Sequence, residues 1–210
     1  RFSNLTDYAV NVVGANQVSI FNNCLNVING ILVSNCSNFN IESNTIISTL
    51  GEDACGVYIT GSSSGLIKDN YLNLKVTKTV YAINTNPVAP FKLSCIGNTI
   101  IGEAYFTVGI YDDSEEVKDN MITLSGNYSI GIVVVSNATV EGNVIIVDAS
   151  NTGSDDAVQD DIGIETAGIK VNNDAMITNN NVVSSGKSIS VVGGSTTISK
   201  NNLAGPVRID

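Results

Sequence analysis

The sequence predicts an all-β protein, a right-handed parallel β-helix (solenoid) of about eight coils with an asparagine ladder. An asparagine in a fixed local pattern recurs every 21 to 37 residues. A second motif recurs between these asparagines: a small residue, then an apolar residue, any residue, and another apolar residue. The apolar runs are rich in Val, Ile and Thr, alternate with a period of two, and are broken by Gly, Asn and Ser. Repeats of this length built from short strands indicate a solenoid.

The asparagine pattern is apolar, two small or polar residues, Asn, any residue, apolar, as in "IESNTIIS" (41–48) and "VEGNVIIV" (140–147). The steps between its asparagines are 21, 26, 28, 22, 23, 37 and 21 residues. The chain bends sharply at this point, and the bend needs a residue in the left-handed backbone conformation. Asn tolerates this conformation better than other residues except Gly. We expect each Asn to be that residue and to bond to the next Asn along the rod. The predicted ladder is Asn23, Asn44, Asn70, Asn98, Asn120, Asn143, Asn180 and Asn201.

The second motif begins roughly 10 to 14 residues before the next ladder asparagine. Each coil therefore carries three short strands: one after the small residue, one that ends two residues before Asn, and one after Asn. Each coil rises by ~4.8 Å, the distance between paired strands. The motif occurs as "GILV" (30–33), "GVYI" (56–59), "VGIYD" (108–112), "GIVV" (131–134), "GIKV" (168–171) and "SISV" (188–191).

Residues 1–210 are predicted as a single solenoid domain. The long step marks an acidic insertion at 148–167, and "TNPVAPF" (85–91) is a smaller excursion. Neither end has an obvious capping helix. We therefore expect a fragment of a longer chain, with further coils of the same parent as neighbours.

The composition narrows the classes of function. The net charge of -10 argues against nucleic-acid binding. There is no apolar run of about 18 residues, so we expect no direct membrane insertion. The absence of histidine removes the commonest general base. Four cysteines without a CxxC motif are buried thiols or form one or two disulfides: Cys24, Cys36, Cys55 and Cys95.

Alternation predicts that the middle residue of each first strand points outward. The two tyrosines of this stripe either offer ring faces to sugars or cover apolar neighbours. The register near residues 81–84 does not settle which residue of that coil belongs to the stripe. The assigned members are Leu32, Tyr58, Tyr111, Val133, Lys170 and Ser190.

These repeats resemble those of the pectate-lyase-like superfamily of parallel β-helices. The Asn-rich sequence of the repeats, as in "SNCSNFNIESNTI" (34–46), is most similar to the sequences of adhesin-like surface proteins of methanogenic archaea. The resemblance is specific for the fold. The regular coils, the acidic polar surface and the missing catalytic set favour an extracellular or cell-surface module without catalysis. Its partner would be a cell-surface glycan or a surface protein of a partner cell.

In enzymes of this superfamily the binding groove follows the first strand of each coil. By that resemblance Tyr58, Tyr111, Asp112 and Lys170 are the predicted ligand-binding residues. Taken by itself, Lys170 is expected to be a solvated charge.

The alternative function is a polysaccharide lyase or glycoside hydrolase acting on acidic polysaccharide. The polygalacturonase motifs are partly matched, in order, by "NTN" (84–86), "DD" (112–113), "GIV" (131–133) and "GIK" (168–170). Asp112 and Asp113 match the paired carboxylates, and Lys170 matches the last lysine. Asn86 stands where an Asp is needed, and Gly168 replaces an Arg. Adjacent carboxylates in one strand point to opposite faces, although inverting hydrolysis needs both at one site.

The acidic insertion predicts either a solvated loop or a calcium site, because carboxylate oxygens are the ligands that Ca²⁺ prefers. "DASNTGSDD" partly echoes an EF-hand loop, but Gln159 stands at the twelfth position. No cofactor is required by this prediction, and calcium is the candidate ion. Its candidate ligands are Asp148, Asp155, Asp156, Asp160 and Asp161, with Glu165 close by.

Overall fold

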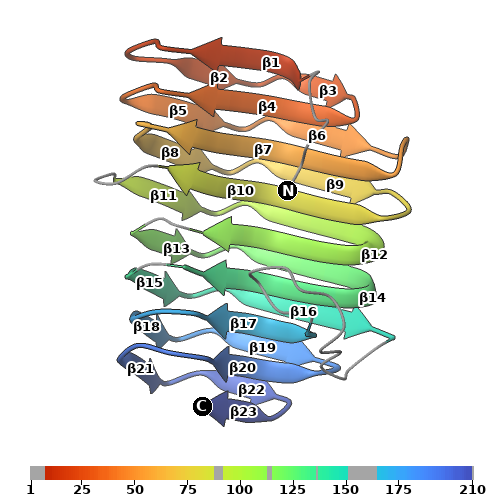
Figure 1. Cartoon of the computed structure of the whole chain (residues 1–210), viewed down its shortest axis with the longest axis vertical. Coiled ribbons are helices and arrows are strands. Elements are labelled where there is room, and N and C mark those ends of the chain that lie inside the picture. Colours follow the sequence, from red (N-terminus) through yellow and green to blue (C-terminus); the bar gives the residue numbers. More distant parts are fainter. Residues whose placement is uncertain (1–7, 88–91, 113–114, 136, 151–164, 210) are drawn as a thin grey trace.

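The computed structural model describes residues 8–87, 92–112, 115–135, 137–150 and 165–209. Within these ranges every regular element is a β-strand, and each pairs in parallel with the equivalent strand one coil away (Figure 1). No helix that could cross a membrane occurs among these residues. The chain is a parallel β-solenoid of about eight turns, as the sequence predicts.

The first strand of each coil follows the small-residue motif. Two long strands, β12 (Thr99–Asp112) and β14 (Met121–Val134), each continue from the third-strand position of one coil into the first-strand position of the next. The remaining first strands are β1 (Tyr8–Val13), β4 (Asn29–Ser34), β7 (Asp53–Gly61), β10 (Thr79–Pro87), β17 (Ala167–Val171), β20 (Lys187–Val191) and β23 (Val207–Ile209).

The second strands end two residues before each ladder asparagine, and the third strands begin directly after it, as predicted. The second strands are β2 (Ser19–Phe21), β5 (Phe39–Glu42), β8 (Gly65–Lys68), β11 (Leu93–Ile96), β13 (Glu116–Lys118), β15 (Ala138–Glu141), β18 (Ala175–Thr178) and β21 (Thr196–Ser199). The other third strands are β3 (Cys24–Asn26), β6 (Thr45–Ser48), β9 (Tyr71–Lys75), β16 (Val144–Ala149), β19 (Asn181–Ser184) and β22 (Asn202–Ala204).

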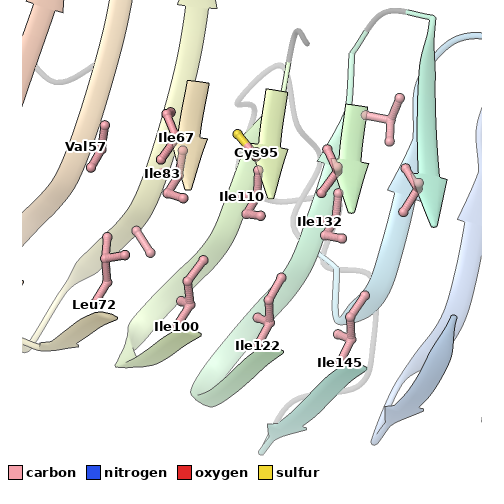
Figure 2. Packing of buried hydrophobic residues seen from close by; sticks show 14 of the residues in the cluster. Val57, Ile67, Leu72, Ile83, Cys95, Ile100, Ile110, Ile122, Ile132 and Ile145 are labelled. Atoms are coloured by element: carbon pink, nitrogen blue, oxygen red, sulfur yellow. The ribbon is translucent and has the colours of Figure 1, made fainter. Parts of the chain in front are cut away.

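The core is a set of rows in which like residues stack from coil to coil (Figure 2). Parallel pairing without register shifts brings these side chains together, and each is almost completely buried. Burying one such side chain contributes about 1.5–3 kcal/mol. The first-strand row includes Val57, Ile83, Ile110 and Ile132, and the third-strand row includes Leu72, Ile100, Ile122 and Ile145.

The small residue of the motif lies where the first strand passes close to the third-strand core row. A Cβ on Gly131 would lie 2.4 Å from the Gly168 carbonyl oxygen and 2.5 Å from Cγ2 of Ile145. A Cβ on Gly56 would lie 2.4 Å from Cδ2 of Leu72. There is no room for a side chain at these points, which explains why the motif begins with Gly.

The ladder asparagines are hydrogen-bonded from coil to coil along the solenoid. In each link, the Oδ1 atom accepts the backbone N–H and the Nδ2 amide of the ladder asparagine one coil earlier, at 2.9–3.1 Å. The Nδ2 group of Asn98 also donates to the carbonyls of Ile67 and Ile96. Each side chain thus satisfies backbone groups at the corner, where the strand pairing is interrupted.

The expectation that the ladder asparagine is itself left-handed is wrong. The residue directly before it has the positive φ, for example Ser43 at 55° and Gly97 at 66°. That residue makes the bend, which leaves the asparagine free to direct its amide along the ladder. The left-handed row is Asn22, Ser43, Asp69, Gly97, Asp119, Gly142, Asn179 and Lys200.

The 37-residue step does not interrupt the stacking. Asn143 donates to Oδ1 of Asn180 from both its backbone N–H, at 3.0 Å, and its Nδ2 group, at 2.9 Å. Strand β14 pairs with β17 across the same step.

All four cysteines are free thiols in the structure. Cys24 is exposed, and the other three are buried. The alternative of buried thiols is therefore confirmed for Cys36, Cys55 and Cys95, whereas Cys24 is a free thiol at the surface.

Replacing Asn98 by Ala removes the acceptor of two bonds from Asn70 and the donor of bonds to Asn120 and two carbonyls. We expect the free energy of unfolding to fall by about 1–3 kcal/mol, because buried groups lose their partners. Urea unfolding followed by circular dichroism measures this. The matched control is Asn23→Ala at the exposed end of the ladder, where the loss should be smaller. Equal losses at both positions would contradict the role of the ladder.

Candidate binding surface

The predicted outward stripe forms a single register row across the outer face of the first strands. Each member is the direct partner of the next, and Asn84 fills the coil for which the sequence left the register open. The row extends to Asn11 at one end and Arg208 at the other. It consists of Leu32, Tyr58, Asn84, Tyr111, Val133, Lys170 and Ser190.

Aromatic rings gather on this outer face over β7, β10 and β12, and one further ring comes from β1. Tyr81 makes edge contacts with Tyr111 and Phe106, with ring centroids 6.2 Å and 6.1 Å apart. The rings of Tyr8 and Tyr58 are stacked at 6.4 Å. All five side chains are partly exposed. We call these five residues the aromatic face.

Part of the aromatic face rests on a small apolar cluster that is separate from the interior core. Val108, Ile130, Val133 and Ala167 are fully buried there, with Tyr111 among the partly buried residues packed against them. Tyr111 therefore covers apolar neighbours and still keeps part of its ring accessible. Val133 points outward but has no exposed surface, so it is not available to a ligand.

The end of the aromatic face near β1 is uncharged at neutral pH. Burial raises the pKa of the Cys55 thiol to about 12. Burial and the neighbouring Cys55 raise the pKa of the Tyr8 hydroxyl above its ordinary value. Both groups therefore stay protonated, so neither Tyr8 nor the fully buried Cys55 adds a negative charge to this end of the aromatic face.

The expectation that Lys170 is a solvated charge is wrong. Its Nζ lies 3.1 Å from Oε1 of Glu165, and both side chains are buried. Lys187 pairs with the other carboxylate oxygen, and Ser190 lies 3.4 Å from it. This group, the Glu165 cluster, lies on the outer face of β17 and β20.

Sequence reasoning treated Glu165 as a neighbour of the calcium ligands and did not identify Lys187. Two lysines on the outer face of adjacent first strands were the available signal, because buried cations require a carboxylate. Burial raises the pKa of Glu165, but hydrogen bonds from Lys187 and the charge of Lys170 outweigh it. The net effect lowers the pKa of Glu165.

Asp112 lies inside the solenoid. It is the last residue of β12 and is fully buried, and its Oδ1 accepts a hydrogen bond from Thr85 Oγ1 at 3.3 Å. Burial, and then the charge of Asp112, raise the pKa of the Cys95 thiol. Lys170, by contrast, is in the outward row. These two members of the candidate catalytic set are therefore on opposite faces of the sheet, and Asp113 lies outside the described residues.

The candidate calcium ligands are only partly described. Asp148 is exposed near the end of β16, whereas Asp155, Asp156, Asp160 and Asp161 lie outside the described residues. In the part of the chain that the structure describes, no three carboxylate, thiol or imidazole groups come together as a metal site. Calcium binding by the insertion stays a prediction.

Comparison of the chain with protein families, with curated proteins and with solved structures found no match. The fold and the chemistry of the outer face are therefore what indicates function.

Replacing Glu165 by Gln leaves Lys170 and Lys187 without their shared carboxylate. We expect the free energy of unfolding at neutral pH to fall by about 3 kcal/mol, because breaking a buried ion pair leaves a buried charge without its partner. A lowered folded-state pKa gives stability that is fully present above the ordinary value of 4.5 and is lost as the pH falls through the folded value.

Denaturant unfolding of wild type and Glu165→Gln between pH 3 and pH 8 checks this expectation. The gap between the two proteins should be largest above about pH 4.5 and should close in acid. A gap that does not depend on pH would show that the carboxylate is not ionised in the folded protein.

Proposed function

We propose that the chain is a non-catalytic, adhesin-like β-solenoid module of a cell surface, and that it binds a neutral glycan along its aromatic face. The observation that carries the proposal is the presence of partly exposed rings on three adjacent coils, at Tyr58, Tyr81 and Tyr111. Adjacent strands are ~4.8 Å apart, so a polymer lying along the solenoid axis meets several rings.

Rings on a rigid sheet suit carbohydrate because the C–H faces of sugar rings pack on aromatic surfaces. The aromatic rings also contribute a large apolar contact area. The tyrosine hydroxyl groups of the aromatic face can both donate and accept hydrogen bonds with the hydroxyl groups of a sugar. An apolar surface with a few polar groups is the usual composition of a small-molecule site.

Charge favours a neutral glycan over an acidic one. The chain has a net charge of -10, and the aromatic face itself contributes no positive charge. A polyanion approaching this surface would be repelled. The same consideration argues against the alternative of a lyase or hydrolase acting on acidic polysaccharide, as does the location of Asp112 inside the solenoid.

The extracellular setting is supported by the resemblance of the Asn-rich repeats to surface proteins. A solenoid suits such a setting because its length grows with the number of coils while its cross-section stays the same. The partner would then be a glycan or glycoprotein of another surface.

A glycan array followed by titration calorimetry tests the proposal. Tyr58→Ala and Tyr111→Ala should each weaken binding of a neutral oligosaccharide roughly fivefold to tenfold, since losing one ring contact corresponds to about 1–1.4 kcal/mol. The matched control is Tyr71→Ala, because Tyr71 is 37% exposed but lies on the third-strand face. Equal effects of the three changes would contradict a site on the aromatic face.

A product assay on polyuronates tests the absence of catalysis. We expect no release of unsaturated or reducing ends above the rate of the buffer. Sustained turnover by wild type that is lost in Asp112→Ala, with folding confirmed by circular dichroism, would overturn the non-catalytic assignment.

A further inference from the structure

Four Asn-x-Ser/Thr tripeptides occur in the chain, beginning at Asn4, Asn35, Asn127 and Asn137. This tripeptide is the acceptor sequence for N-linked glycans, and its use requires a surface position in an exported chain. The transferring enzyme must reach the side-chain amide of the asparagine and the hydroxyl group two residues later. Asn4 lies outside the described residues, and the structure separates the other three by how accessible these two groups are.

The tripeptide at Asn127 is closed in the folded chain. Asn127 lies within β14 and is only partly exposed, and its Oδ1 accepts a hydrogen bond from the Ser150 hydroxyl at 2.8 Å. Ser129, which carries the hydroxyl group of this tripeptide, has no exposed surface, and Tyr128 between them is also buried. An enzyme reaches the Ser129 hydroxyl only if β14 opens.

The tripeptide at Asn35 is exposed but held by its neighbours. Asn35 lies at the corner between a first and a second strand, and its Oδ1 accepts the backbone N–H of Ser62 at 3.0 Å. Its Nδ2 group donates to the hydroxyl of Ser34 at 3.3 Å. The hydroxyl of Ser37 donates to Oδ1 of Asn16 at 2.6 Å. Both recognition groups are therefore engaged, one with the following coil and one with the preceding coil.

The tripeptide at Asn137 is both exposed and unengaged. Asn137 directly precedes β15 at the same kind of corner (Figure 1), and its side chain is exposed. Thr139 is partly exposed, whereas Ala138 between them is buried. Among the residues that the structure describes, none forms a hydrogen bond with the side chain of Asn137 or Thr139.

The local backbone presents the two groups of this tripeptide together. Because side chains alternate along an extended chain, Asn137 and Thr139 lie on the outer side while Ala138 points into the core. Strand pairing holds Thr139 in place, since its backbone N–H donates to the carbonyl of Glu115 at 2.9 Å. Asn137 itself lies before the strand, where its amide can turn toward an enzyme.

We infer that Asn137 is an acceptor for an N-linked glycan and that Thr139 is its recognition residue. In the transfer, Nδ2 of Asn137 forms a bond to the anomeric carbon of a sugar that is activated as a lipid-linked pyrophosphate. The bond between that carbon and the pyrophosphate oxygen breaks, and the lipid pyrophosphate leaves with the electron pair. The amide nitrogen loses one proton, so the product is a neutral N-glycosyl amide.

The inference takes only the extracellular setting from the proposed function. Asn137 is not a member of the aromatic face, and its modification does not require that face to bind a glycan. Failure of glycan binding and failure of glycosylation are therefore separate results.

Glycosylation of the purified, folded chain by an oligosaccharyltransferase with a lipid-linked oligosaccharide tests the inference. Mass spectrometry of proteolytic peptides then gives the occupancy of each site. We expect occupancy at Asn137 to exceed that at Asn127 roughly tenfold or more, because modification of Asn127 requires local opening of β14. An unmodified Asn137, or equal occupancy of Asn127 in the folded chain, would overturn the inference.

Two controls separate accessibility from the sequence itself. A synthetic peptide of residues 124–131, which carries the Asn127 tripeptide without the fold, should be glycosylated in the same reaction. An unmodified peptide would mean that sequence and not burial excludes Asn127, and would remove the structural basis of the ranking. Thr139→Ala should abolish modification of Asn137 while Thr139→Ser retains it, with folding of both variants checked by circular dichroism. Unchanged occupancy in Thr139→Ala would also overturn the inference.

Discussion

The asparagine ladder is the interaction on which the rest of the structure depends. At the corner between the second and third strands, the backbone pairing that joins the coils is interrupted. Unpaired backbone groups buried at such a corner would be costly. One side chain per coil satisfies them, because its Oδ1 accepts two bonds and its Nδ2 donates to the next asparagine and to nearby carbonyls. The ladder therefore closes each corner and fixes each coil against its neighbours.

Fixed register determines what lies on each face. A shift of one residue would exchange the inward and outward side chains of a strand. With the register held, Ile110 stacks in the core while Tyr111, the next residue, lies beside Asn84 outside. The long insertion leaves this order intact, since the ladder continues from Asn143 to Asn180. The proposed glycan surface is a consequence of this regular stacking.

Much of the fold could be predicted because each coil repeats the same sequence pattern. The strand positions, the ladder and the outward row all follow from the spacing of Asn and Gly. The left-handed position was assigned one residue too late, because Asn tolerates that conformation and the residue before it is also small or polar. The glycines at 97 and 142 were the signal for the right position.

Side-chain exposure on the outer face was harder to predict. Alternation tells which way Lys170 points, but its burial depends on Glu165 and on a lysine from the following coil. The signal for this contact was not a local pattern but the placement of two lysines, Lys170 and Lys187, on the outer face of adjacent first strands. Asp112 was predictable in direction, because Tyr111 points outward and its neighbour must point inward.

Hydrogen exchange of the asparagine side-chain amides, followed by NMR in deuterated buffer, tests the ladder most directly. The amide protons of the six ladder asparagines between the two terminal ones, which the structure buries, should persist long after the side-chain amides of exposed asparagines have exchanged. Equally fast exchange of all asparagine side chains would contradict the account, because the corners would then be open to water.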